Sequence, residues 1–114
     1  MNHGLDKDVV LKIQQVFLKQ EKIHQAILYG SRAKGTHTAG SDIDLALKGK
    51  QLTIKDLLQL RVDLDSLNLP YTIDLALYDE IQNHDLLDHI NRVGIVLYKK
   101  TSHGDVSRGS KTAL

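Results

Sequence analysis

The sequence contains no cysteine, no tryptophan, one phenylalanine and one proline. Without cysteine there can be no disulfide framework and no thiolate metal site, which fits a reducing cytosol. Because only 4% of the residues are aromatic, the core must be built from leucine, isoleucine and valine. No apolar run approaches the roughly 20 residues that span a bilayer, and the N-terminus MNHGLDKDVV lacks the pattern of an export signal. We therefore expect a cytoplasmic protein that does not act at a membrane.

The length of 114 residues and the hydrophobic content of 41% allow one compact domain with a modest core. The formal net charge is +1, but basic residues gather at the C-terminus, so that residues 1–98 carry about −2 by the same count. A nucleic-acid-binding surface would need a broad basic stripe, so a nucleic-acid partner is not expected. We predict a domain over residues 1–98 and a polar, flexible tail over residues 99–114, which lack periodicity.

Apolar spacing predicts alternating helices and strands. Helices are expected over 5–17, where an early aspartate favours the first turn, over 54–66 behind a capping box of Thr53 and Asp56, and up to a glycine C-cap at Gly94. Strands are expected at HQAILY, DIDLALK, YTIDLALY and IVLY, with a short helical turn at SRAKG. This order predicts an α/β or α+β fold in which helices cover a sheet.

Three aspartates lie in two matching strand segments, DIDLAL and YTIDLALY. Side chains alternate along a strand, so Asp42 and Asp44 point to one face, and Asp74 occupies the equivalent place in the second segment. A lone pair of acids would most often be solvated strand residues, but three acids beside a glycine-serine turn favour a divalent metal. Magnesium is usually held by one or two carboxylates plus substrate phosphates, and a further carboxylate could accept the proton of an attacking hydroxyl.

The turn after the first predicted strand has the chemistry of a phosphate site. Gly30 allows a positive φ and a close approach of the backbone, and the amides and hydroxyl that follow at Ser31 can cradle anionic oxygens. Arg32 and Lys34 are candidates to meet phosphate charge. A P-loop is excluded because Thr36 stands where its lysine must be, and the dinucleotide pattern GxGxxG is absent.

The six histidines form no recognisable zinc motif. His84 and His89 are five residues apart on a predicted helix and so do not share a face, and we interpret His37 as an ordinary loop histidine.

Taken together, Gly30-Ser31, ten intervening residues, Asp42-x-Asp44 and the later Asp74 resemble the minimal nucleotidyltransferases of the DNA polymerase beta superfamily, over about residues 24–98. The resemblance implies a polymerase-beta-like palm with a mixed sheet of about four strands and helices packed on it. It also implies an enzyme that binds ATP or another nucleoside triphosphate with Mg²⁺, two ions being typical, and transfers the nucleoside monophosphate to a hydroxyl. Two metal ions can stabilise both the attacking and the leaving oxygen of such a displacement.

The resemblance also assigns roles to individual residues. Asp42 and Asp44 would hold both metal ions, and Asp74 would hold the catalytic ion and activate the acceptor hydroxyl. The remaining predicted residues would bind the nucleotide; they are Gly30, Ser31, Arg32, Lys34 and Ser41.

Larger superfamily members attach a helical domain that completes the acceptor site, whereas after Tyr98 this chain has only the polar segment. In the minimal family the helical half is typically a separate HEPN-type protein, and in some toxin-antitoxin pairs the transferase adds AMP to a tyrosine of the toxin. The resemblance therefore implies an adenylylating antitoxin with a HEPN-type partner. Two alternatives stay open, which are nucleotidylation of a small hydroxylated molecule bound with such a partner, and an antitoxin that acts by binding alone.

Overall fold

The computed structural model describes residues 3–100. Its helices are α1 (Lys7–Leu18), α2 (Ser31–Lys34), α3 (Ile54–Asp65) and α4 (His84–Val93), with a 3₁₀ turn η1 (Tyr78–Glu80). Its strands are β1 (Ile23–Tyr29), β2 (Ile43–Gly49), β3 (Ile73–Leu77) and β4 (Ile95–Lys99). Residues 101–114 of the predicted tail lie outside the described residues. The first two tail residues continue the sheet, because Lys99 ends β4 and the Lys100 amide donates to the His24 carbonyl at 2.8 Å.

The strands form one mixed sheet in the order β3-β2-β1-β4. β1 runs antiparallel to both of its neighbours, β2 and β4, whereas β2 and β3 are parallel and are connected through α3. A parallel pair needs such a crossover, because a tight hairpin can join only antiparallel strands. The predicted α+β architecture with a four-stranded mixed sheet is thus confirmed.

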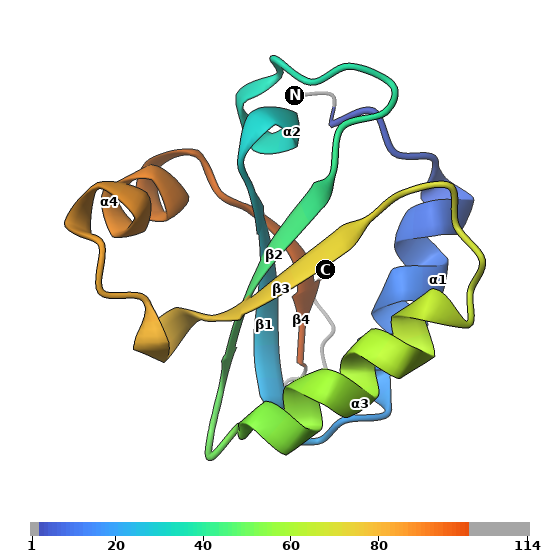
Figure 1. The fold of residues 1–114 in the computed structure, drawn as a ribbon, viewed down its shortest axis with the longest axis vertical. Helices are drawn as coiled ribbons and strands as arrows, with labels where there is room; N and C mark the ends of the chain where they lie inside the picture. Colours follow the sequence, from blue (N-terminus) through green and yellow to red (C-terminus); the bar gives the residue numbers. More distant parts are fainter. Residues whose placement is uncertain (1–2, 101–114) are drawn as a thin grey trace, which may run out of the picture.

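Helices cover both faces of the sheet: α1 and α3 lie on one side and α4 on the other (Figure 1). The α1/α3 side holds the larger core, in which Phe17 packs with aliphatic residues such as Ile43 and Leu45. The α4 side holds a smaller cluster of Ile27, Ala46 and Ile90. Alternation along β2 explains the division, because odd-numbered residues face the larger core and even-numbered residues, including Asp44, face α4.

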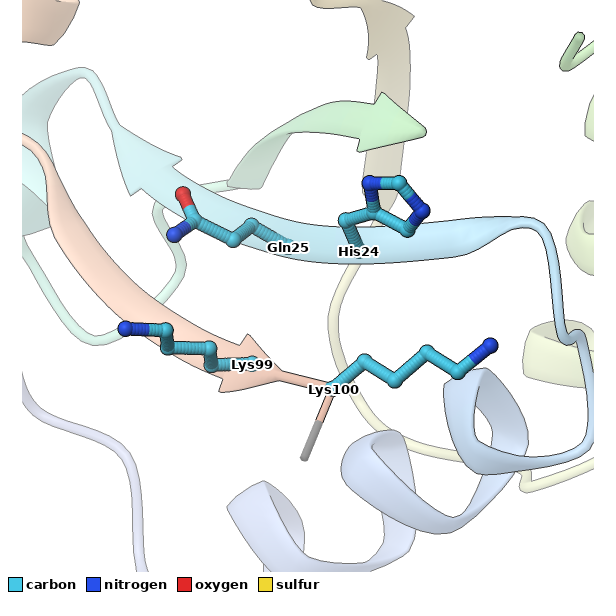
Figure 2. Close-up of a pocket in the computed structure, with 4 residues that line it drawn as sticks. All are labelled: His24, Gln25, Lys99 and Lys100. Carbon is cyan, nitrogen blue, oxygen red and sulfur yellow. The ribbon is translucent and has the colours of Figure 1, made fainter. Parts of the chain in front are cut away.

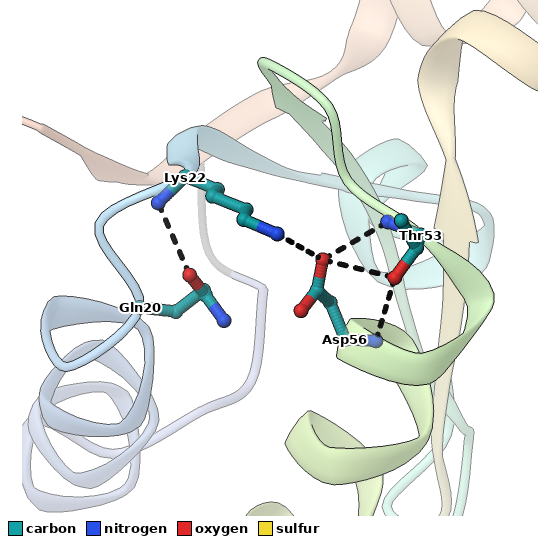
Figure 3. A network of polar contacts seen from close by, with 4 residues as sticks. All are labelled: Gln20, Lys22, Thr53 and Asp56. Carbon is teal, nitrogen blue, oxygen red and sulfur yellow. Dashed lines mark hydrogen bonds and ion pairs between the residues drawn. The ribbon is translucent and has the colours of Figure 1, made fainter.

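The predicted capping box at the start of α3 is present. The Thr53 hydroxyl accepts from the Asp56 amide at 3.2 Å, and the Asp56 carboxylate accepts from the Thr53 amide at 3.0 Å. Lys22, just before β1, donates to the same carboxylate at 3.0 Å (Figure 3). This network fixes the start of α3 against the β1–β2 pair.

Gly94 ends α4, as expected, but not through a left-handed C-cap. Its φ of −58° and ψ of 142° are accessible to any residue. A side chain at this position would collide with the Ile90 carbonyl and would lie 2.6 Å from the Ile27 side chain. The glycine is therefore explained by the close packing of α4 against β1.

Candidate active site

One end of the sheet brings together the turn after β1 and the first residues of β2 and β3. Tyr29, the last residue of β1, pairs with Asp44 on β2, and Asp44 pairs with Asp74 on β3. Asp44 and Asp74 therefore project from the same face, and Gly30 follows directly at the end of β1. Asp42 immediately precedes β2 and is exposed. The three predicted aspartates thus lie around the same end of the sheet as the predicted phosphate turn.

Gly30 is in direct contact with this group. Its φ of 79° and ψ of −155° fall in a region that is essentially restricted to glycine. A Cβ atom at this position would lie 2.5 Å from the Asp44 Oδ2 atom. The turn and the carboxylate can be this close only because residue 30 has no side chain.

Negative charge concentrates where the strands meet. Burial, followed by the charges of Asp74 and Asp42, raises the pKa of Asp44. Burial and the charges of Asp44 and Asp74 also raise the pKa of the Tyr29 phenol. Mutual repulsion among carboxylates favours a bound cation at this place.

The donor set fits magnesium, which prefers carboxylate oxygens. Within residues 3–100, no group of three or more histidine or acidic side chains is gathered closely enough to hold a metal ion by itself. Magnesium commonly takes one or two carboxylates and completes its shell with water and substrate phosphates. The residues present therefore fit a magnesium-nucleotide complex better than a metal site built from protein ligands alone.

Asp74 lies at the open edge of the sheet, since β3 has a neighbour on one side only. Its carboxylate is half exposed, and the Arg61 guanidinium approaches it from α3 at 4.0 Å. A cavity of about 330 Å³ lies next to this pair. Its lining comprises Arg61, Asp65, Tyr71, Thr72, Ile73 and Asp74.

Arg32 is buried, with 1% of its surface exposed. Its Nε and Nη2 atoms donate to the Ser41 carbonyl at 3.2 and 3.0 Å, Nη2 also donates to Ala39 O at 3.2 Å, and Nη1 donates to His3 O at 2.9 Å. The guanidinium also stacks on Tyr71, 4.9 Å from the ring centroid. It therefore ties α2 to the residue before Asp42 and to the segment that leads into β3.

This placement gives Arg32 a structural role that the sequence did not predict. The guanidinium is buried and donates to loop carbonyls, so these contacts position the loop before Asp42, and the nucleotide-binding role of Arg32 stays a prediction. The motif gives no sign of the contact with His3, because that residue is 29 positions away in the sequence.

The other residues that are predicted to bind the nucleotide lie on α2 and in the loop before β2. Ser31 begins α2 and is half-buried, and Lys34 is exposed at the end of that helix. The Ser41 hydroxyl accepts from the Thr38 amide at 2.9 Å, and thus helps to shape the loop before Asp42.

His89 was not among the predicted site residues. From α4 its Nε2 atom accepts a hydrogen bond from the Gly30 amide at 2.9 Å, and its ring meets Tyr29 edge to face. No local signal marks this residue, because its partner is 59 positions away in the sequence.

A second cavity, of about 400 Å³, lies far from the aspartates. Figure 2 shows its lining, in which His24 and Gln25 of β1 lie beside the segment that carries Lys99 and Lys100. These residues lie toward the start of β1, whereas Gly30 follows its end. This cavity contains none of the predicted site residues.

Comparison with known protein families decides the identity of the fold. Residues 11–103 match the family described as "Polymerase beta, Nucleotidyltransferase". The chain belongs to this nucleotidyltransferase family. The resemblance to the DNA polymerase beta superfamily is thereby confirmed. A comparison with curated protein sequences gives no match.

Several solved structures with the same nucleotidyltransferase fold come from toxin-antitoxin complexes. One, described as a toxin-antitoxin with AMP-PNP, is 22% identical with a TM-score of 0.64, covering 85% of this chain and 76% of the other. The toxin-antitoxin MntA-HepT gives 20% identity and a TM-score of 0.62, covering 83% and 74%. A structure of a tri-AMPylated Shewanella oneidensis HEPN toxin in complex with MNT antitoxin gives 19% identity and a TM-score of 0.63. The match covers 84% of this chain and 74% of the other. At these identities the comparison establishes the fold alone.

Among the described residues, no helix has the length and apolarity needed to cross a membrane.

Proposed function

We propose that this nucleotidyltransferase uses MgATP to transfer AMP to a hydroxyl of a HEPN-type helical partner, a tyrosine being the favoured acceptor, and acts as the antitoxin of the pair. The observation that carries the proposal is the pairing of Asp44 with Asp74 beside Gly30. It places two carboxylates and a glycine turn within one small region, as transfer to a hydroxyl requires. We also propose that the protein is cytoplasmic, because ATP is available there.

Magnesium, when bound, would neutralise charge on the triphosphate and stabilise the oxygens of the displacement. Asp42 and Asp44 would provide its carboxylate ligands, and Gly30 and Ser31 would hold the triphosphate. Asp74 would orient the acceptor hydroxyl and accept its proton. The hydroxyl oxygen would then bond to the α-phosphorus as the bond to pyrophosphate breaks. Positioning and charge neutralisation suffice for this chemistry, so no nucleophilic side chain is needed.

The position of Asp74 supports an acceptor that arrives from outside the chain. The carboxylate lies at the sheet edge, half exposed, beside the cavity of about 330 Å³. We propose that the acceptor hydroxyl enters there. The solved structures with a similar fold support a protein acceptor, because one of them contains an AMPylated HEPN toxin in complex with an MNT antitoxin.

The test is incubation of the purified chain with α-labelled ATP and Mg²⁺, with and without a HEPN-type protein encoded next to it. Label should appear on the partner, should require Mg²⁺, and should fall by at least about 100-fold in Asp42→Ala and Asp74→Ala. Asp79→Ala is the matched control, because Asp79 is exposed on η1 and lies outside the proposed site.

The outcome also separates the alternatives. Label on a small hydroxylated compound, with none on the partner, would replace the protein acceptor. Neutralisation of the partner that survives Asp42→Ala would favour an antitoxin that acts by binding alone.

A further inference from the structure

We infer that His89 is a positioning residue of the nucleotide site, which holds the Gly30 turn in the conformation that receives the triphosphate. The nucleotide part of this inference rests on the proposed function. The contact itself does not, because it is made within the chain: the Gly30 amide donates to His89 Nε2 at 2.9 Å.

Glycine gives the turn its shape but does not hold it there. A residue without a side chain can adopt many backbone conformations, so the observed φ of 79° and ψ of −155° need outside support. Two hydrogen bonds provide it: the Gly30 carbonyl accepts from the Lys34 amide at 3.1 Å, and the Gly30 amide donates to His89. The first bond belongs to the short helix α2. The second comes from the opposite side of the turn, and it is the only one of the two made by a side chain.

Helix α4 is itself firmly placed, so His89 can act as a fixed support. The next residue, Ile90, is buried against Ile27 and Ala46 of the sheet. Asn91 accepts a hydrogen bond from the Tyr78 hydroxyl at 2.9 Å, which connects α4 to the end of β3. The edge-to-face contact with Tyr29 orients the His89 ring itself.

The direction of the hydrogen bond specifies the state of the ring. An Nε2 atom that accepts from an amide carries no proton, so the neutral ring must carry its proton on Nδ1. Nitrogen NMR on the wild-type protein can identify this tautomer without nucleotide, metal or partner. Finding the proton on Nε2 would overturn the inference.

Two substitutions test the role. In His89→Leu the acceptor is lost, so the Gly30 amide resonance should move, and the dissociation constant and KM for MgATP should rise by about three- to tenfold, as expected for one hydrogen bond. Because the group does not touch the reacting atoms, kcat should change much less than KM. His89→Gln places an amide oxygen near the former Nε2 position and should restore most of the affinity and the Gly30 resonance. His84→Leu is the matched control, since His84 is exposed on the first turn of the same helix.

The outcomes separate this inference from the proposed function. An unmoved Gly30 resonance in His89→Leu, or a moved resonance with unchanged MgATP affinity, would overturn the positioning role while leaving the proposed function intact. If the wild-type chain binds no MgATP, the proposed function fails together with the nucleotide role of His89. The tautomer and the Gly30 resonance would then still report whether the contact exists.

Discussion

Asp44 on β2 and Asp74 on β3 are directly paired residues of two parallel strands, and their carboxylates share one face of the sheet. Adjacent side chains on one face interact, and like charges placed opposite each other destabilise a sheet. The arrangement therefore costs folding energy in the absence of a cation. A bound cation would compensate the charge of the two carboxylates, so their pairing is explained if this part of the sheet is a binding site.

This cost gives a prediction for Asp44→Asn in the metal-free protein. Because burial and neighbouring carboxylates raise the pKa of Asp44 above its ordinary 3.8, the folded state binds the proton more readily than the unfolded state. Stability is then lost as pH rises from 3.8 through the raised pKa. At pH 7 in EDTA, we expect Asp44→Asn to melt at a higher temperature than wild type, with a gap that closes toward pH 4. Asp79→Asn controls for the removal of one exposed charge, and a lower melting temperature for Asp44→Asn would contradict the prediction.

Gly30→Ala and Gly35→Ala form a matched pair. Both glycines have a positive φ, 79° and 81°, so each alanine should lower stability. The cost should be about 1–2 kcal/mol at Gly35, which is in the left-handed helical region, and larger at Gly30, whose ψ of −155° lies in a region essentially restricted to glycine. Only at Gly30 would the new Cβ meet another atom, the Asp44 Oδ2 at 2.5 Å, whereas nothing lies within 4 Å at Gly35. We expect Gly30→Ala to lose about 100-fold in nucleotidyl transfer, as a displaced catalytic group does, and Gly35→Ala to lose little. Equal losses in the two variants would show that contact with Asp44 is not what requires Gly30.

Arg32 and Lys34 are two cations of the same short helix with opposite environments. Arg32→Lys removes hydrogen bonds between a buried guanidinium and loop carbonyls, and should lower the free energy of unfolding by about 3 kcal/mol. Lys34→Gln changes an exposed residue, so stability should stay within about 0.5 kcal/mol, while KM for MgATP rises if this lysine faces the phosphates. Urea denaturation without nucleotide measures the first effect and steady-state kinetics the second. A stable Arg32→Lys variant with a raised KM alone would show that Arg32 binds the nucleotide and is not needed to hold the loop.

The capping network of α3 predicts a pH-dependent loss of stability. Hydrogen bonds from Thr53 and then Lys22 lower the pKa of Asp56 below its ordinary 3.8. The stability that this carboxylate contributes is therefore present above 3.8 and is lost as pH falls toward the lowered value. Asp56→Asn should be less stable than wild type at pH 7, and the difference should shrink in acid.

Thr53→Ala tests the same cap without removing a charge. It should cost about 1 kcal/mol in urea denaturation, as the loss of an N-cap does. Because Thr53 follows the end of β2 opposite to Asp44, nucleotidyl transfer should be unchanged under conditions where both proteins are folded. A large loss of transfer would show that α3 is coupled to the site.

Local patterns in the sequence were sufficient to predict the elements of the fold. The alternation in DIDLAL and in YTIDLALY predicted two strands, each with a buried face and an acid-bearing face, and both are observed as β2 and β3. Thr53 and Asp56 form the predicted capping box. These predictions succeed because period, capping and turn chemistry depend on residues a few positions apart.

The same reasoning could not reveal contacts that depend on how the folded chain packs. The sequence predicts that Arg32 binds the nucleotide, but it gives no sign that the guanidinium also donates to carbonyls of His3, Ala39 and Ser41. Gly94 stands at the predicted helix end for a packing reason instead of a conformational one.

The sequence by itself determined which residue types are available, the order of helices and strands, and the face on which each aspartate projects, because these follow from spacing along the chain. The tertiary structure alone decided that β2 pairs with β3 in a register that aligns Asp44 with Asp74, and that His89 meets Gly30. The physical reason is that strand order, burial of a cation and hydrogen bonds between remote segments depend on how the layers pack, and packing joins residues that share no local pattern.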